Sequence, residues 1–164
     1  MDRKVKGITI MEVLVVMAII AILASASILG LRNLVQRERL YSAMTQVVND
    51  LKEVQFRSIS SNNLWGVRFC GNVSQYKIFA VDPATVVGGC PRDANPSCTN
   101  DATTQRLVSL PPGVLPRADF YVLFDRRGYP LNWSCGIGAG NITLSNSYGS
   151  RTVIVDRLGR IRYE

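Results

Sequence analysis

The segment KGITIMEVLVV, residues 6–16, opens an apolar stretch that decides the organisation of this 164-residue chain. Between Ile8 and Leu31 the sequence contains one charged residue, Glu12, and residues 13–31 carry no charge at all. At a helical rise of ~1.5 Å per residue, this uncharged run is just long enough to cross the hydrocarbon core of a bilayer. We therefore predict a membrane-spanning helix over residues 8–31.

Three interpretations fit the N-terminal residues 1–31. The first is a plain transmembrane anchor. The second is a secretory signal peptide, because a basic start precedes the apolar run and a small-residue cleavage pattern ends at Ala26. That interpretation would release a secreted, soluble binding domain. The third is a prepilin signal, which is cut after Gly7 and leaves the apolar helix on the mature chain.

Glu12 favours the third interpretation. A carboxylate inside an apolar segment costs a few kcal/mol in a membrane unless something compensates for it. An anchor or a signal peptide has no use for such a group. Cutting after Gly7 would free an α-amino group on Ile8, which the Glu12 carboxylate of a neighbouring subunit could neutralise in the core of a filament.

From residue 6 to about residue 31 the chain closely resembles the prepilin signal of type IV pilins and type II secretion pseudopilins. In that family a membrane prepilin peptidase cuts after a glycine and N-methylates the next residue, positions that map to Gly7 and Ile8. The family's glutamate maps to Glu12. The residue after the cut is usually Phe or Met in the family, whereas this chain has Ile8. The resemblance implies a leader of residues 1–7 and assembly with other pilin or pseudopilin subunits.

The same resemblance implies a location for the protein. It places the mature chain in the bacterial inner membrane as a single-pass protein with its C-terminal head in the periplasm. From there the chain would enter a pilus or pseudopilus. The positive charges do not decide this topology, because basic residues lie close to both ends of the apolar segment.

The helix is predicted to continue beyond the membrane as an amphipathic segment over residues 32–60. Apolar side chains recur there at steps of three and four residues, which is the period of one helix face. We expect this stripe to pack against a C-terminal sheet. The stripe consists of Leu34, Leu40, Tyr41, Met44, Val47, Val48, Leu51 and Val54.

Residues 61–164 are predicted to form a β-rich head. Short alternating segments are separated by turn-forming residues, and residues 82–104 have the composition of a long loop. The fold class we predict is α+β, with one long N-terminal helix packed on an antiparallel sheet. The expected strands lie near residues 65–69, 76–80, 106–110, 121–124, 141–144, 151–155 and 159–163. Turns are predicted at residues 125–128 and 156–159, and the second of them would join the last two strands as a hairpin. The polar cluster of residues 58–63 is predicted to end the helix.

All four cysteines follow the apolar segment, so they would lie in an oxidising compartment if that segment crosses the inner membrane. Four cysteines allow three pairings. Cys90 and Cys98 flank a turn-rich loop, so a local bridge between them is the pairing we favour. Cys70 would then be bonded to Cys135.

The composition argues against catalysis. The chain contains no histidine, which excludes Ser–His–Asp and Cys–His arrangements. It also lacks the GxGxxG, P-loop and HExxH motifs, and its cysteine spacings contain no CxxC pair. We therefore predict a protein that is not an enzyme and that binds neither a metal nor a cofactor.

A weaker resemblance concerns the end of the head. Residues 124–128 and 153–162 look like the GspH/FimT class of minor pilins and pseudopilins. In the FimT branch a C-terminal Gly-Arg-x-Arg motif is associated with DNA binding during transformation, and that motif maps to residues 159–162. The resemblance therefore implies a minor pilin or pseudopilin, with a DNA-binding pilus subunit as the alternative.

The charges at this end are consistent with contact to phosphates. In a strand Arg160 and Arg162 point to the same face, and Arg151 and Arg157 add positive charge nearby. Arginines on one face could bind phosphates without sequence preference. They could equally form a solvated strand face or pair with a neighbouring subunit. The formal net charge of +7 is compatible with nucleic acid, acidic lipid or an acidic protein partner, and selects none of them.

Overall fold

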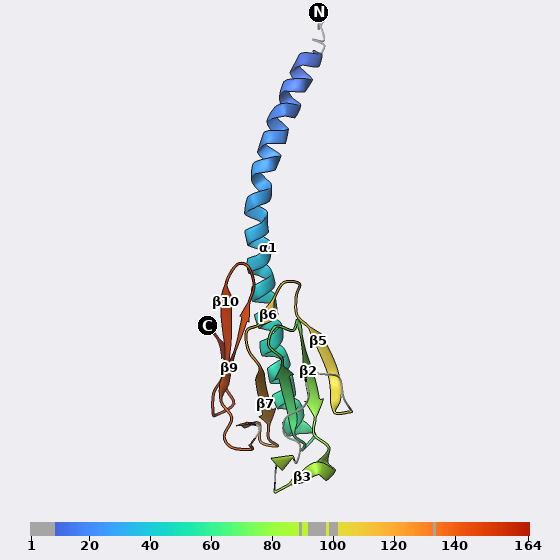
Figure 1. The fold of residues 1–164 in the computed structure, drawn as a ribbon, viewed down its shortest axis with the longest axis vertical. Coiled ribbons are helices and arrows are strands. Elements are labelled where there is room, and N and C mark those ends of the chain that lie inside the picture. The colour runs from blue at the N-terminus through green and yellow to red at the C-terminus, as the bar shows by residue number, and fades with distance from the viewer. Residues whose placement is uncertain (1–8, 89, 92–97, 99–101, 133) are drawn as a thin grey trace, which may run out of the picture. The chain divides into compact units, whose positions relative to one another are not determined.

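The computed structural model describes residues 9–88, 90–91, 98, 102–132 and 134–164. By their internal contacts the residues divide into two units, Met1–Val35 and Gln36–Glu164 (Figure 1). The predicted leader, together with Ile8, lies outside the described residues.

Helix α1 runs without a break from Ile10 to Ser60. It ends where Asn62 adopts a left-handed backbone conformation, with φ of 51°. The amides of Ser61 and Asn63 close the last turn by donating to helix carbonyls. The end predicted from the polar cluster after residue 57 is therefore confirmed.

In the unit of residues 1–35, the described side chains of α1 are exposed, and all of them except Glu12, Arg32 and Asn33 are apolar. Ile10 is 82% exposed and Ile22 is 69% exposed. No helix in the described part of the chain is both long enough and apolar enough to cross a membrane. The predicted span of residues 8–31 includes Ile8 and the side chains of residues 25–30, which the structure does not describe, and it stays a prediction.

In the unit of residues 36–164, one face of α1 is buried against the head, as the apolar stripe predicts. The expectation is wrong for Leu34, which is 55% exposed, and for Tyr41, which is 58% exposed. Tyr41 follows Leu40 by one residue and therefore points about 100° away from it around the helix. Its interaction with the Tyr163 side chain raises the pKa of Tyr41. The buried face consists of Leu40, Ala43, Met44, Val47, Val48, Leu51 and Val54.

Two antiparallel sheets form most of the described head (Figure 1). The first has, in spatial order, β5 (Thr104–Ser109), β2 (Gln75–Ala80), β1 (Trp65–Phe69), β7 (Phe120–Phe124) and β8 (Pro130–Leu131). The second has, in spatial order, β11 (Ile161–Tyr163), β10 (Ser150–Val155), β9 (Gly140–Ser145) and β6 (Leu115–Pro116). The strands β3 (Val86–Val87) and β4 (Cys90–Pro91) pair separately, after the short 3-10 helix η1 (Pro83–Thr85).

The main core lies between α1 and both of these sheets. From the first sheet, Val67, Phe69 and Phe124 are completely buried in this core. From the second, Leu144 and Val153 are completely buried in it. One helix face thus closes two sheets, which confirms the predicted α+β fold. The hairpin predicted at the end of the chain is also confirmed, because β10 pairs with β11.

A polar cluster joins α1 to β2 and β5 beside this core. The Tyr76 hydroxyl donates a hydrogen bond of 2.5 Å to Asp50 Oδ2, and Arg106 Nη2 lies 2.8 Å from Asp50 Oδ1. Arg106 also reaches Glu53 Oε2 at 3.1 Å. Burial and the bond to Asp50 raise the pKa of Tyr76. The cluster gives the Tyr76 hydroxyl, at the edge of the core, a hydrogen-bond partner on α1. It thereby fixes the rotation of the helix against the first sheet.

Leu51 provides a test of this packing. The Leu51→Ala variant should lose about 3 kcal/mol of the free energy of unfolding, because a fully buried side chain leaves a cavity. The matched control is Leu158→Ala, at a leucine that is 71% exposed, which should change stability by less than about 0.5 kcal/mol. Chemical denaturation of the full chain in detergent measures both values. Equal losses for the two variants would contradict the packing described.

Candidate functional site

The start of α1 places Glu12 in the first helical turn. The Glu12 amide donates to the Thr9 carbonyl at 3.1 Å and to Thr9 Oγ1 at 3.3 Å, so Thr9 is the N-cap of the helix. A carboxylate in the first turn is also favoured by the helix dipole. The Glu12 side chain is exposed and, among the described residues, has no ion-pair partner. Sequence reasoning overlooked the capping role of Thr9, although Thr-x-x-Glu is its usual signature.

At the C-terminal end of α1, two tight turns of the head have the same construction. One follows β7 and begins at Asp125; the other follows β10 and begins at Asp156. In each turn the aspartate Oδ1 accepts hydrogen bonds from the second and fourth following amides, at 2.8–2.9 Å. Each turn closes with a glycine at positive φ, Gly128 at 84° and Gly159 at 79°. Both were predicted as turns, and the aspartates serve as their caps.

Gln55 of α1 connects the two turns. Its Nε2 donates to the Gly128 carbonyl at 2.8 Å and to the Gly159 carbonyl at 3.0 Å. A Cβ atom on Gly159 would lie 2.6 Å from both Gln55 Nε2 and the Gly128 carbonyl oxygen, so only glycine fits there. One feature of the sequence could have indicated the contact between Gln55 and the two turns. Gln55 follows Leu51 by four residues and is therefore a polar residue on the apolar stripe.

The arginines predicted as a DNA-binding site lie on β10, on β11 and in the turn between them. Arg157 is exposed in the turn, Arg160 follows it, and Arg162 is exposed on β11 opposite Ile154. The Arg160 side chain is 72% exposed, with its Nε 3.8 Å from Asp156 Oδ2. Arg151 is the second residue of β10, near the end far from the turn, about five residues or ~16 Å away. Arg157, Arg160 and Arg162 thus lie on the turn and strand that end the hairpin, and Arg151 lies on the other strand.

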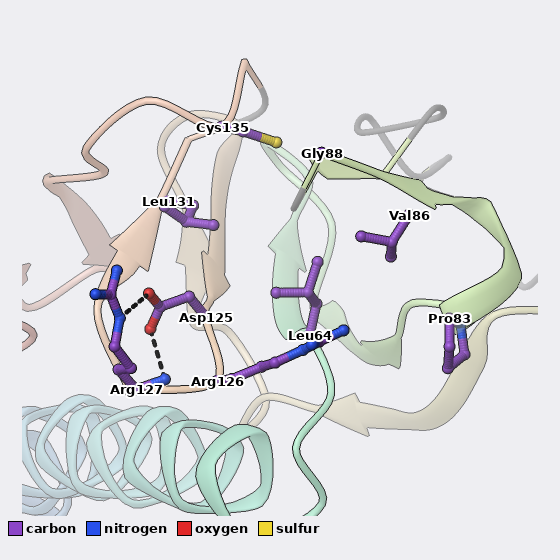
Figure 2. Close-up of a pocket in the computed structure, with 9 residues that line it drawn as sticks. All are labelled: Leu64, Pro83, Val86, Gly88, Asp125, Arg126, Arg127, Leu131 and Cys135. Carbon is purple, nitrogen blue, oxygen red and sulfur yellow. Dashed lines mark hydrogen bonds and ion pairs between the residues drawn. The ribbon is translucent and has the colours of Figure 1, made fainter.

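A hollow of about 570 Å³ lies on one side of the Asp125 turn (Figure 2). Figure 2 shows the Arg126 side chain extended past Leu64, and Asp125 bonded to Arg127. Pro83 and Val86 line the opposite wall. The Asp125 carboxylate is occupied by the turn amides and by Arg127, whose Nε is 3.3 Å from Asp125 Oδ2. Among the described residues no group of three or more His, Cys, Asp or Glu side chains is placed to hold a metal ion.

The disulfide prediction is wrong. Cys98 is bonded to Cys70, with a Cα–Cα distance of 6.0 Å, and therefore not to Cys90. Cys135 is disulfide-bonded as well, but its predicted partner Cys70 is already used. The side chain of Cys90 lies outside the described residues. Cys70 directly follows β1, so the bond ties the long connection between β2 and β5 back to the first sheet.

Comparison with known proteins finds a family model that matches the N-terminal segment and solved structures that are similar in fold. Residues 2–28 match the family model described as the prokaryotic N-terminal methylation motif. The structure is similar to the type IV minor pilin FimU of Pseudomonas aeruginosa, with a TM-score of 0.56 and 14% identity over 79% of this chain and 90% of that chain. It is also similar to EpsH of Vibrio cholerae, a minor pseudopilin of the type II secretion system. There the TM-score is 0.53, with 11% identity over 77% of this chain and 96% of that one.

No curated protein sequence matches the chain significantly. The N-terminal motif and the fold of the head nevertheless agree with each other. The chain thus combines a match to the prokaryotic N-terminal methylation motif with a fold similar to that of a minor pilin and of a minor pseudopilin. The resemblance noted in the sequence is thereby confirmed.

Proposed function

We propose that the chain is a minor pilin or pseudopilin, a structural and non-enzymatic subunit of a type IV pilus or of a type II secretion pseudopilus. One observation carries the proposal: a methylation motif over residues 2–28 leads directly into a helix that continues to Ser60 and carries a pilin-type head. Neither part alone would suffice. An apolar N-terminal helix suits many anchored proteins, and a fold can serve unrelated functions.

The proposal includes processing and location. Prepilin peptidase would cut between Gly7 and Ile8 and methylate the new N-terminus of Ile8. The subunit would first lie in the bacterial inner membrane with its head in the periplasm. It would then move into the filament, where the apolar side chains exposed on α1 would be buried against other subunits.

Glu12 would direct that assembly step. Its carboxylate is exposed at the first turn of α1 and, in the described part of the chain, meets no cation. In a filament core of low dielectric constant, the free α-amino group of a neighbouring subunit's Ile8 would be a strong partner. An unpaired carboxylate in the same place would oppose assembly, because its desolvation would not be compensated.

The Glu12→Gln variant separates this role from helix capping. Glutamine can still accept and donate hydrogen bonds at the third position of a capping box, but it carries no charge. We expect membrane insertion to stay normal and the fraction of subunits in sheared filaments to fall at least about tenfold, by loss of a buried charge pair. Immunoblots of membrane and filament fractions measure the ratio. Normal incorporation of the glutamine variant would exclude the proposed charge role.

A second candidate function is DNA binding by the same subunit. The observation that favours it is the exposure of Arg157, Arg160 and Arg162 on one hairpin, where the guanidinium of Arg160 is only loosely paired with Asp156. Such a surface would bind phosphates without sequence preference and with strong salt dependence.

The double variant Arg160→Ala, Arg162→Ala tests this function. We expect it to weaken binding to a double-stranded oligonucleotide by roughly tenfold at low salt and to lower the slope of log affinity against log salt by about 2. The control is Lys52→Ala, which removes an exposed charge from α1. Fluorescence anisotropy with the full chain in detergent measures affinity and slope. If both parameters are unchanged, these arginines are not the DNA site.

A further inference from the structure

A second hollow, of about 440 Å³, lies between the two aspartate turns. Its floor is apolar and is built from Pro130, Leu131, Ile137 and Leu158. Arg127 contributes from the first turn and Arg157 from the second. A volume of this size accommodates one or two side chains of a peptide.

Three of the apolar side chains that line this hollow are exposed. Ile137 and Leu158 are each 71% exposed, and Tyr129 is 44% exposed. These three side chains lie close together, since all three line the same hollow. A group of exposed apolar side chains with charged neighbours is typical of a protein interaction site.

The charges around the hollow are positive. Arg157 lines the hollow, is exposed and, among the described residues, forms no ion pair. The carboxylates of Asp125 and Asp156 are occupied by the amides of their own turns. Arg127 pairs with Asp125 at 3.3 Å but remains 79% exposed, so its guanidinium is still open to a second carboxylate.

The hollow is also rigid by construction. Each turn is fixed by its aspartate and by a glycine at positive φ, and Gln55 fixes the two turns to each other. A partner would therefore meet side chains whose backbone is already ordered, which lowers the entropy cost of binding.

We propose that this hollow binds an acidic peptide segment of a different subunit, with an apolar side chain on the floor and flanking carboxylates on Arg127 and Arg157. The inference rests on the proposed function, which places the chain among other subunits. The formal net charge of the chain is +7, and it is +5 without the predicted leader, because Arg3, Lys4 and Lys6 outnumber Asp2 there by two. This charge favours a heterologous, acidic partner over a second copy of the chain. Nucleic acid fits the hollow less well, because the floor is aliphatic and Tyr129 is the one aromatic side chain in the described lining.

Fluorescein-labelled peptides test the site with the full chain in detergent micelles. The probe is Glu-Glu-Leu-Glu-Glu, compared with Gln-Gln-Leu-Gln-Gln, Glu-Glu-Ala-Glu-Glu and a single-stranded oligonucleotide. We expect the first peptide to bind at least about fivefold more tightly than the other two peptides, because it alone combines carboxylates with a large apolar side chain. Fluorescence anisotropy measures the affinities.

Variants of the chain then locate the binding. Arg157→Ala and Leu158→Ser should each weaken the binding of Glu-Glu-Leu-Glu-Glu by roughly tenfold. Arg151→Ala is the matched control, because it removes the same charge from the far end of β10, and it should stay within about twofold of the parent chain.

Three results would overturn the proposal. They are no binding of the acidic peptide at millimolar concentration, equal affinity for its glutamine analogue, and binding of the oligonucleotide alone. The measurement needs no filament. If it fails while Glu12→Gln still blocks assembly, the docking site is wrong and the subunit function stands. If the peptide binds while Glu12→Gln assembles normally, the docking site stands and only the charge role of Glu12 is excluded. If the peptide binds but the parent chain is absent from sheared filaments, the docking site stands and the subunit function is wrong.

Discussion

The burial of one face of α1 between two sheets is the interaction on which the head depends. Each sheet has an apolar inner face that needs a partner, and the same helical stripe covers both. Leu51, Val47 and Val54 are completely buried at the centre of this arrangement. The stripe belongs to the same helix that carries residues 10–28 of the N-terminal motif.

Toward the end of the helix the packing becomes polar, and this change creates the surface proposed for binding. Gln55 occupies a position on the apolar stripe, but it hydrogen-bonds the carbonyls of Gly128 and Gly159. The two turns lie so close together that there is no room for a Cβ at Gly159. Their arginines are held outward. The basic character of this end of the head thus follows from the way in which the two sheets are joined.

Local pattern was enough to predict the helix, the longer strands and the final hairpin, because each rests on short-range periodicity or turn chemistry. It failed for features that depend on long-range contact. The Cys70–Cys98 bond spans 28 residues and requires a loop to return to β1, which no spacing rule reveals. The strands of two residues, β6 and β8, carry no periodicity. The position of Tyr41 in the sequence fits the spacing of the helical stripe, but its side chain lies beside Tyr163.

The candidate sites also differ in whether local sequence pattern or only the folded structure reveals them. Glu12 could be singled out from the sequence because a lone carboxylate in an apolar run is conspicuous. The assignments of Gly7 and Ile8 came from the resemblance, and both residues lie outside the described part of the chain. The hollow between the Asp125 and Asp156 turns could not be predicted, because its walls come from two sheets that only the folded head brings together.

The most direct test of the central claim is the mass of the mature N-terminal peptide from protein isolated from native membranes. A chain that begins at Ile8 and carries one added methyl group is the result that the pilin-like account predicts. A chain that begins at Ser27, after the small-residue pattern ending at Ala26, would contradict it. The protein would then be a secreted domain without the apolar part of α1, and the proposed filament assembly would have no structural basis.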